Sequence, residues 1–573
     1  MRVADYLAKY LYAQGVTHVF ELVGGMITVL LDAMHQQGNI KIVSMHHEQG
    51  AGFAAEGWAR ITGIPGVAMA TSGPGATNLL TAIGSCYFDS VPTVFITGQV
   101  NRHEQKGDKA IRQLGFQETD IISMARPITK AAIQISDPAQ FAQQLQEAFT
   151  LAISGRPGPV LIDIPMDVQR VDIGDPDIII ATRDLSRLPT NETRLEFLKR
   201  LGLALNKSQC PLILAGGGIR SGQAISQFRE LVEALKIPVV NSLMGVDVLG
   251  NDNKNHVGML GSYGNRWTNL AVGQSDLLLV LGSRLDVRQT GAMTEAFKIG
   301  REIFHIDIEA GETNNRVVGC ETHIDDLAEF LTYATKSLKD WHFEESYEHW
   351  HGKIKSLNCQ YPDTKEIDSG DGTNPNVFMH EMCRYTQEVG AFVADVGQHQ
   401  MWAAQSLEFY GNQRWLTSGG MGSMGFALPA AIGAAFALNG KPVLVIAGDG
   451  GFQCNIQELQ TVVRNKLPIK IIIVNNKTHG MVRQFQDSYL SQRYQSTLWG
   501  YDAPDFVELA KAYKIISVAS KDVSTVFSSN NLPLPMLINL EIDTFLNVYP
   551  KIAFGQPIYG MEPEFKPLEM EGT

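Results

Sequence analysis

The sequence predicts an α/β protein of three doubly wound domains, each built on a parallel sheet covered by helices. Short Val/Ile/Leu runs alternate with amphipathic helical stretches along the chain, as in PLILAGG, DLLLVLGS and KPVLVIAGD. These runs are apolar on both faces and are followed by Gly or Asp, which is typical of parallel strands buried between helices. A length of 573 residues is enough for three domains of ordinary size.

Two polar segments divide the chain. They run from about Asp172 to Glu192 and from about Ser346 to Asn374, and both are rich in breakers, as linkers are. We therefore expect an N-terminal domain over residues 1–172, a central domain over 190–342 and a C-terminal domain over 370–550.

Composition excludes several classes of protein. The net charge of −13 is spread without long runs, which argues against nucleic acid as a partner. The six cysteines are scattered without a CxxC pair, which argues against a disulfide scaffold or a zinc site. No apolar run approaches the roughly 20 residues that span a bilayer, and the N-terminus lacks the apolar core of a signal peptide. We expect a cytoplasmic protein without a membrane partner.

A metal-ligand pattern lies in the C-terminal domain. Gly448-Asp449-Gly450 ends one apolar run, and Asn475-Asn476 ends the next, after a helix-like stretch. Parallel strands joined by a helix bring their carboxyl ends side by side. Asp449 and Asn476 would then offer two oxygen ligands to Mg²⁺, which commonly takes one or two protein ligands and completes its shell with phosphate oxygens.

The glycines beside these ligands suit a phosphate. Gly448, Gly450 and Gly451 carry no side chain, so a phosphate can approach backbone amides at a helix start. Together with the metal pattern, they predict a diphosphate held through magnesium. The alternative is an ordinary strand–helix–strand unit with turn glycines.

The N-terminal domain offers an acidic candidate. Glu48 comes just after an apolar run from Ile40 to Val43, with Met45, and opens a helix of small residues. A buried carboxyl at this place is a candidate acid/base group. The alternative is a carboxylate that stabilises a helix start. The loop from Thr71 to Gly75, with Asn78 after it, reads either as a cofactor contact or as a simple turn.

Placed together, six segments resemble one family. EQGAGFAAEGWARITGIPGVAMATSGPGATN, DSVPTVFITGQV, SGRPGPVLIDIP, GQHQMWAAQ, TSGGMGSMGFALPAAIGAA and NNKTHGMV are similar to acetolactate synthases (acetohydroxyacid synthases), a branch of the thiamine-diphosphate enzymes. The segments follow the family's order of pyrimidine-binding, central and diphosphate-binding domains, from about residue 1 to 550. The resemblance implies thiamine diphosphate and Mg²⁺ as cofactors.

The resemblance also implies residue roles. Glu48 would hydrogen-bond the cofactor's aminopyrimidine, because a carboxyl among apolar neighbours can share a proton near neutral pH. The Gly422 carbonyl would accept from the same ring, and Met424 would bend the cofactor. Thr478 would add a carbonyl oxygen to the two metal ligands. Gly25 and Gln117 are further catalytic positions, and the other cofactor-binding positions are Ser72, Pro74, Asn78, Gly397, Gln398, His399, Gln400, Gly448, Gly450, Gly451, Gly480 and Met481.

The central domain resembles a flavin-binding domain of the same family. AGGGIRSG, GMLGSYGNR, GSRLDVRQTG and HIDIE place Gly or polar groups at strand ends, which suits a nucleotide. The resemblance implies a structural FAD, because the ligase reaction has no redox step. The alternative is a domain without a cofactor. The implied FAD positions are Arg156, Gly217, Gly218, Gly261, Gly282, Arg284, Arg288 and Asp307.

Several positions depart from the family pattern. Met166 stands where the family has Lys, Ser262-Tyr263 where it has Met-His, Phe485 where it has Trp, and Val23 where it has Pro. The residues expected to activate the 2-ketoacid donor match the family, whereas several positions expected around the second, acceptor substrate differ from it. Acceptor contacts are expected from Arg288, which can pair bidentately with a carboxylate, and from Phe116 and Phe485.

The resemblance implies a carboligase that decarboxylates pyruvate or another 2-ketoacid and transfers the two-carbon unit to a second carbonyl. One alternative keeps this donor and uses a keto-sugar nucleotide as acceptor; another is a 2-ketoacid decarboxylase or pyruvate oxidase. A non-catalytic subunit would be expected to lose Glu48, Asp449 or Asn476, and all three are present. The family shares its active site between subunits, so a homodimer or homotetramer is expected.

Overall fold

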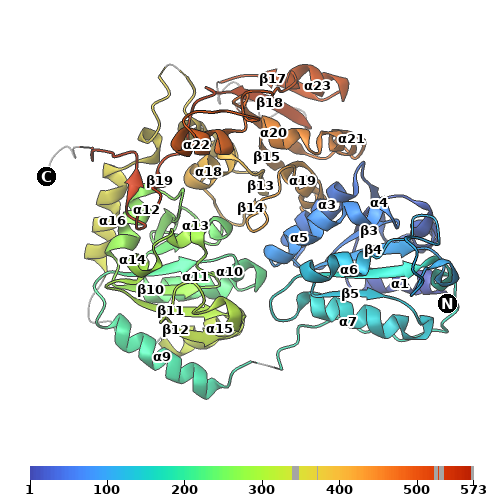
Figure 1. The fold of residues 1–573 in the computed structure, drawn as a ribbon. Coiled ribbons are helices and arrows are strands. Elements are labelled where there is room, and N and C mark those ends of the chain that lie inside the picture. The colour runs from blue at the N-terminus through green and yellow to red at the C-terminus, as the bar shows by residue number, and fades with distance from the viewer. Residues whose placement is uncertain (187, 339–346, 371, 522–526, 528–533, 569–573) are drawn as a thin grey trace.

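The computed structural model describes residues 1–186, 188–338, 347–370, 372–521, 527 and 534–568. Three six-stranded sheets follow one another along the chain, and every pairing within them is parallel. Figure 1 shows them as three lobes, with the N-terminal lobe in blue and cyan, the central lobe in green and the C-terminal lobe in orange and red. The predicted α/β class with three doubly wound domains is confirmed.

The N-terminal sheet has the strand order β2-β1-β3-β4-β6-β5. Its strands are β1 (His18–Leu22), β2 (Lys41–Ser44), β3 (Gly66–Ala70), β4 (Thr93–Gln99), β5 (Ala131–Gln134) and β6 (Pro159–Pro165). Its helices are α1 (Val3–Ala13), α2 (Thr28–Gln37), α3 (Glu48–Thr62), α4 (Pro74–Asn78), α5 (Leu80–Phe88), α6 (Ile121–Ala125), α7 (Phe141–Ile153) and α8 (Met166–Gln169). The central strands β3, β4 and β6 are buried on both faces, which explains why their sequences are mainly apolar.

The central sheet has the order β12-β11-β10-β7-β8-β9. Its strands are β7 (Pro211–Ala215), β8 (Val239–Asn241), β9 (His256–Met259), β10 (Leu277–Leu281), β11 (Glu302–Asp307) and β12 (Glu321–Ile324). Its helices are α9 (Asn191–Leu205), α10 (Gly218–Ser221), α11 (Ile225–Leu235), α12 (Arg266–Gln274), α13 (Val287–Thr290), α14 (Thr294–Lys298) and α15 (Leu327–Leu338).

The C-terminal sheet has the order β14-β13-β15-β16-β18-β17. Its strands are β13 (Ala391–Ala394), β14 (Arg414–Leu416), β15 (Val443–Gly448), β16 (Ile469–Asn475), β17 (Ile516–Ala519) and β18 (Met536–Glu541). Its helices are α17 (Pro375–Cys383), α18 (Gln398–Ser406), α19 (Ala427–Ala437), α20 (Asp449–Gln453), α21 (Leu459–Arg464), α22 (Gly480–Tyr489) and α23 (Phe506–Ala512).

A two-stranded antiparallel ribbon follows this sheet. It consists of β19 (Lys551–Ile552) and β20 (Met561–Glu562). The ribbon returns the chain to the central domain, where the Ile552 amide donates to the Ser262 carbonyl oxygen at 2.9 Å. Among the described residues, no helix is both long enough and apolar enough to cross a bilayer.

In each sheet the strand order reverses near the middle, between β1 and β3, between β7 and β10, and between β13 and β15. Ligands of open α/β sheets bind outside the carboxyl ends of the strands at such a reversal. The glycine-rich and polar segments of the sequence follow these strands. Gly25 lies just after β1, Gly217 and Gly282 after β7 and β10, and Asp449 after β15.

The N-terminal and C-terminal domains share one apolar core, in which α3 crosses α19. A Cβ added to Gly57 would overlap the Ala430 carbonyl, and one added to Gly433 would overlap the Ala54 carbonyl. The small residues of both helices therefore let the two backbones touch. The helix that opens with Glu48 is thereby fixed to the C-terminal domain of its own chain.

The second polar segment is not only a linker. Its residues 348–360 form α16 (Glu348–Gln360), which packs beside α12 on the central domain. Trp350 is buried, and its indole nitrogen donates to the Pro211 carbonyl oxygen at 3.0 Å. The sequence of this helix is mostly polar, which favours its interpretation as a linker. Only Trp350 and Ile354, one turn apart, form its buried apolar stripe.

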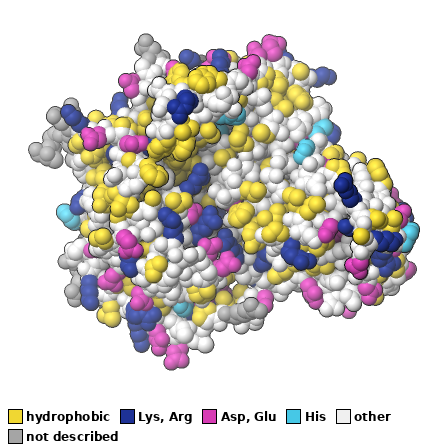
Figure 2. All heavy atoms as spheres, viewed as in Figure 1, with side chains coloured by type: hydrophobic (Ala, Val, Ile, Leu, Met, Phe, Trp, Pro, Cys, Tyr) yellow, Lys and Arg dark blue, Asp and Glu magenta, His cyan; other side chains and the backbone are white. Residues whose placement is uncertain are grey.

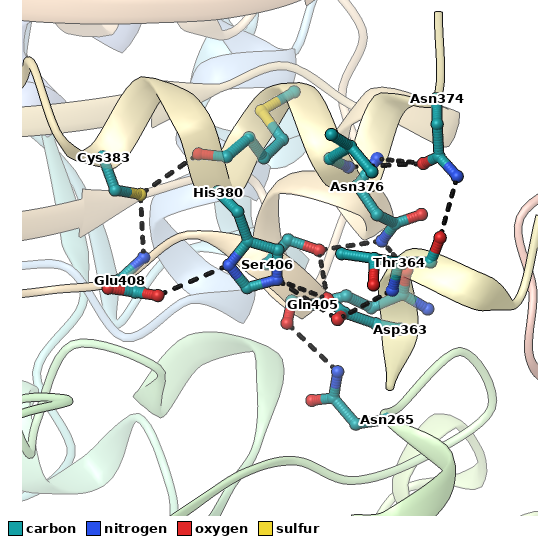
Figure 3. A network of polar contacts seen from close by, with 12 residues as sticks. Asn265, Asp363, Thr364, Asn374, Asn376, His380, Cys383, Gln405, Ser406 and Glu408 are labelled. Atoms are coloured by element: carbon teal, nitrogen blue, oxygen red, sulfur yellow. Dashed lines mark hydrogen bonds and ion pairs between the residues drawn. The ribbon is translucent and has the colours of Figure 1, made fainter. Parts of the chain in front are cut away.

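A polar network joins the C-terminal domain to the central domain (Figure 3). His380 lies between two carboxylates, with Nε2 2.9 Å from Asp363 Oδ2 and Nδ1 3.4 Å from Glu408 Oε1. Asn265 of the central domain donates to the Gln405 carbonyl oxygen at 3.0 Å. Burial lowers the pKa of His380, but its hydrogen bonds to the two carboxylates outweigh burial and raise the pKa to about 10.

This histidine predicts a pH-dependent stability. The pKa of His380 is about 10 in the folded protein and about 6.5 in the unfolded chain. The protonated ring therefore contributes its full stabilisation below pH 6.5, and this stabilisation is lost as the pH rises toward 10. We expect urea unfolding to show H380Q as less stable than the wild type at pH 6.5, with the difference shrinking toward pH 10. H349Q, at an exposed position of α16, is the control. A pH-independent difference would contradict this assignment.

Candidate active site

The two predicted metal ligands lie side by side. Strands β15 and β16 pair with Gly448 opposite Val474, so Asp449 and Asn476 leave the same edge of the sheet. Asn476 Oδ1 is 3.3 Å from Asp449 Oδ1 and 2.8 Å from the Thr478 carbonyl oxygen. The oxygens of Asp449, Asn476 and the Thr478 carbonyl thus lie close together, and in the part of the chain that the structure describes no hydrogen-bond donor bridges one of them to another.

This convergence fits a magnesium ion. Ligand oxygens about 2.1 Å from an octahedral centre are about 3.0 Å apart along each edge, close to the separations seen. Turning over the Asn476 amide would place its nitrogen between the oxygens, but its oxygen would then face Gln398 Oε1 at 2.9 Å. In the present orientation the amide nitrogen donates to that same oxygen. The amide is therefore held with its oxygen toward the cluster.

Asp449 has one neutral hydrogen-bond donor from a distant segment. The Tyr501 hydroxyl donates to Asp449 Oδ2 at 2.8 Å. Burial raises the pKa of Asp449 to about 6, against the effect of this hydrogen bond. A buried carboxylate without a cationic side chain on it gains most from a bound cation.

His399 lies next to this cluster and carries an unsatisfied polar atom. Its ring packs beside Gly448, where an added Cβ would lie 2.9 Å from the ring. His399 Nε2 is buried and has no hydrogen-bond partner among the described residues. Burial lowers the pKa of His399 to about 3, so the ring is neutral. A buried polar atom without a partner beside this oxygen cluster fits a polar ligand, and a diphosphate oxygen would accept from Nε2 in the tautomer that carries its proton there.

The neighbouring glycines are required by packing. A Cβ on Gly450 would lie 2.6 Å from the His479 ring, and one on Gly451 would lie 2.8 Å from Asp395. A Cβ on Gly480 would overlap the Gln398 side chain. These contacts give each glycine a structural role in addition to the predicted approach of phosphate. Met481, the next residue, is partly buried against the C-terminal core.

Glu48 begins α3 and is buried, with 6% of its surface exposed. The Asn78 amide donates to Glu48 Oε2 at 2.9 Å, and an added Cβ on Gly75 would lie 3.3 Å from Glu48 Oε1. The predicted loop of the N-terminal domain therefore does meet the glutamate. The hydroxyl of Ser72 in this loop is buried and has no partner among the described residues. Pro74 begins α4.

Two other predicted catalytic positions lie next to this loop. Gln117 has φ 65° and packs on Gly73, where an added Cβ would lie 3.0 Å from Gln117 Cβ. Gly25 stands between Gly24, which packs on the Thr71 side chain, and Met26, whose amide donates to that side chain at 3.3 Å. Gly25 and Gln117 therefore flank the loop from Thr71 to Gly75.

The loop between β14 and α19 carries Gly422 and Met424. Gly422 has φ 69°, a conformation that favours glycine. Met424 is 38% exposed. The apex of this loop thus projects away from the core.

Other predicted contacts are not formed within one chain. Phe116 is 80% exposed, and Phe485 is 54% exposed and stacks on Tyr489 with ring centres 4.8 Å apart. The Gln400 side chain donates to the Thr417 hydroxyl at 2.6 Å, so its amide nitrogen is engaged inside the C-terminal domain. Gly397 immediately precedes α18.

A large cleft lies where the three domains meet. It contains about 250 Å³ of accessible space, and Figure 2 shows basic side chains gathered around the hollow. The residues proposed for FAD converge on it, and the cleft is lined by Arg156, Gly217, Gly218, Gly282, Arg284, Arg288 and Asp307. Gly261 is not part of the lining, but both of its neighbours, Leu260 and Ser262, are.

The charged groups of this cleft have distinct roles. Arg156 bonds to Glu309 at 2.7 Å and Glu312 at 2.5 Å, so it ties the N-terminal domain to the central one. Burial raises the pKa of Asp307, at the end of β11, to about 6. An acidic residue at such a strand end can bind a ribose hydroxyl.

Some site residues lay outside the sequence motifs. Tyr501 is separated from Asp449 by 52 positions and belongs to no recognised pattern. Asp395 holds the Gly425 and Ala427 amides at 3.0 and 3.1 Å. Its position directly after β13, at a strand reversal, is a signal that sequence reasoning could have used.

Comparison with known families agrees with this geometry. The family described as "Thiamine pyrophosphate enzyme, N-terminal TPP binding domain" matches residues 1–124. The corresponding central domain matches residues 198–333, and the C-terminal TPP binding domain matches residues 395–530.

Three similar proteins cover nearly the whole chain. The acetolactate synthase large subunit of Porphyra purpurea is 36% identical, over 95% of this chain and 92% of its own. The acetolactate synthase isozyme 2 large subunit of Escherichia coli (strain K12) is 35% identical, over 97% of this chain and 98% of its own. The acetolactate synthase large subunit of Lactococcus lactis subsp. lactis (strain IL1403) is 37% identical, over 94% of this chain and 92% of its own. This chain therefore belongs to the acetolactate synthase family of thiamine-diphosphate-dependent enzymes.

Proposed function

We propose that this carboligase decarboxylates pyruvate and joins the two-carbon unit to a second 2-ketoacid, forming 2-acetolactate when the acceptor is also pyruvate. The observation that carries the proposal is the oxygen cluster of Asp449, Asn476 and Thr478. It supports a metal-held diphosphate in a chain whose relatives are named acetolactate synthases.

Thiamine diphosphate, when bound, supplies the carbanion chemistry by which a 2-ketoacid loses CO₂ and its acyl unit adds to another carbonyl. Asp449, Asn476 and the Thr478 carbonyl would hold Mg²⁺, and His399 would contact the diphosphate. Glu48 would hold a proton against the aminopyrimidine ring. The Gly422 carbonyl and Met424 would orient that ring from the other side.

A second candidate acceptor has its own support. Met166 at the start of α8 replaces the family's lysine, and Phe485 replaces its tryptophan. The first change removes a charge, and the second removes an indole donor. These changes favour testing other carbonyl acceptors, including a keto-sugar nucleotide, with the same donor.

Product analysis tests the function directly. We expect the protein, supplied with pyruvate, thiamine diphosphate and Mg²⁺, to release CO₂ and 2-acetolactate, identified by mass. A new adduct formed only when a keto-sugar nucleotide is added would favour the second candidate. Acetaldehyde as the main product would indicate a decarboxylase, and hydrogen peroxide would indicate an oxidase. Either would contradict the carboligase assignment.

We also propose a homodimer, or a tetramer built from dimers, that shares each active site. Apolar side chains are exposed on both halves of the site, on the loop that carries Phe116 and on α22, which carries Val482 and Phe485. Figure 2 shows apolar side chains over α5 and around α22, on either side of the hollow. A second copy that covers these surfaces would bring Glu48 of one chain toward Asp449 of the other.

The central cleft supports FAD as a further cofactor. Its glycines lie at a strand reversal, and a Cβ on Gly218 would lie 2.7 Å from the Gly282 backbone, so the two strand ends approach closely. Arg284 and Arg288 line the same cleft and could receive phosphates. We expect the purified protein to be yellow and to release FAD, identified by mass, on denaturation. A colourless protein that takes up no added FAD would contradict this proposal.

A further inference from the structure

The loop between Ser418 and Gly425 is held at its two ends by one carboxylate from each domain. At its second end, Asp395 of the C-terminal domain accepts the Gly425 and Ala427 amides. At its first end, Asp89 of the N-terminal domain accepts the Gly419 amide at 3.0 Å and the Gly420 amide at 2.7 Å. The loop bearing Gly422 and Met424 thus depends on a domain other than its own.

Asp89 is an unusual residue for its position. It caps the carboxyl end of α5, where a negative charge is unfavourable, and its side chain is only 2% exposed. Arg60 of α3 compensates this charge through a hydrogen bond of 2.8 Å. Two backbone amides complete the carboxylate's partners, as charge-assisted hydrogen bonds do in buried sites.

Arg60 reaches both ends of the same loop. Its guanidinium donates to the Thr417 carbonyl oxygen at 3.0 Å, just before the loop, and lies 5.6 Å from the centre of the Phe426 ring, just after it. Glu56, one turn earlier on α3, accepts from Arg60 at 2.5 Å and balances its charge. The ion pair of Arg60 and Asp89 therefore brackets the loop.

The apex of the loop has weaker support than its ends. The Ser423 amide donates to the Ser418 hydroxyl at 3.1 Å, which closes the loop on itself. Met421 and Met424 are both partly exposed. The direction of the apex is therefore set where the loop begins, at the amides that Asp89 holds and at Met421, whose sulfur packs beside Gly84 of α5.

We infer that Asp89 is a positioning residue that sets the Gly422–Met424 loop for the cofactor, acting from the N-terminal domain through the Gly419 and Gly420 amides. The inference rests on the proposed function only in giving the loop its cofactor role. Asp89 does not touch the reacting atoms. Loss of its charge would let the apex shift, while the diphosphate contacts at Asp449 and His399 stay in place.

The variant D89N tests this inference. The amide keeps the size of the carboxylate but cannot accept both backbone amides and the guanidinium with full charge. We expect the Gly419 and Gly420 amides to exchange with deuterium about tenfold faster in the cofactor-free protein. With saturating thiamine diphosphate and Mg²⁺, we expect kcat to fall about tenfold or more, with a much smaller change in cofactor affinity.

The matched control is D325N in the central domain. Asp325 is equally buried, pairs with Arg194 at 2.6 Å and accepts the Asp326 amide, but it lies away from the loop. We expect D325N to keep the wild-type exchange at Gly419 and Gly420 and the wild-type kcat. Exchange and kcat of D89N that match those of D325N would overturn the inference.

The test remains decisive if D89N does not fold. In the wild-type protein, residue-resolved exchange should show the Gly419 and Gly420 amides protected relative to those of residues 421, 422 and 424, and equal exchange would overturn the inference. Failure of the proposed function would be seen separately, because the wild-type protein would then release no 2-acetolactate from pyruvate, whatever the exchange at Gly419 and Gly420.

Discussion

The variant E48Q is expected to bind thiamine diphosphate like the wild type and to lose turnover by at least about 100-fold, the lower end of general acid–base contributions. Glutamine keeps the size of the side chain and an oxygen for the Asn78 amide, which now donates to Glu48 Oε2. It cannot share a proton with the aminopyrimidine. The loss should therefore appear in kcat, because the diphosphate contacts lie in the other domain.

The measurement is steady-state turnover with pyruvate, together with calorimetric titration of the cofactor in the presence of Mg²⁺. E21Q is the control, because Glu21 is also a buried carboxyl of the N-terminal domain and bonds to Ser44 rather than to the loop. Wild-type turnover in E48Q would remove Glu48 from the mechanism. A loss of turnover that follows a loss of cofactor binding would assign Glu48 to binding alone.

The positions at strand ends could be predicted from the sequence, because local pattern and topology are enough to place them. Asp449 and Asn476 follow apolar runs joined by a helical stretch, and such units connect neighbouring parallel strands. The same argument places Gly217 and Gly282 at a common edge. What the pattern could not supply is the inward turn of the Asn476 amide, which depends on Gln398 from another strand end.

Long-range polar contacts could not be predicted. Asp89 and Gly420 are 331 positions apart, and neither belongs to a periodic pattern that would mark a partner. Tyr501 likewise reaches Asp449 from a segment without a regular element. Such contacts arise from the packing of segments that are distant in sequence, as of α3 against α19, and a single sequence carries no local signal for it. The helix α16 was missed because its buried stripe is only two residues wide.

The variant D449A is expected to weaken magnesium-dependent binding of thiamine diphosphate by at least about 100-fold, since even outer partners of metal ligands contribute 10- to 100-fold. Removing this carboxylate leaves Asn476 and Thr478 with one oxygen each and no negative charge between them. Calorimetric titration of the cofactor at several Mg²⁺ concentrations measures the effect. D502A removes an exposed carboxylate next to Tyr501, the donor to Asp449, and should bind normally. Wild-type affinity in D449A would discard the metal assignment.

Coexpression of E48Q with D449A separates a shared site from one contained within a single chain. If each site combines Glu48 of one subunit with Asp449 of the other, a mixed dimer has one site with both changes and one with neither. Activity should then return in the mixed dimer, although each variant alone is inactive. If each chain contained a whole site, every site would carry one of the two changes, and the mixture would stay inactive. Recovery therefore requires that the two residues act across the subunit interface.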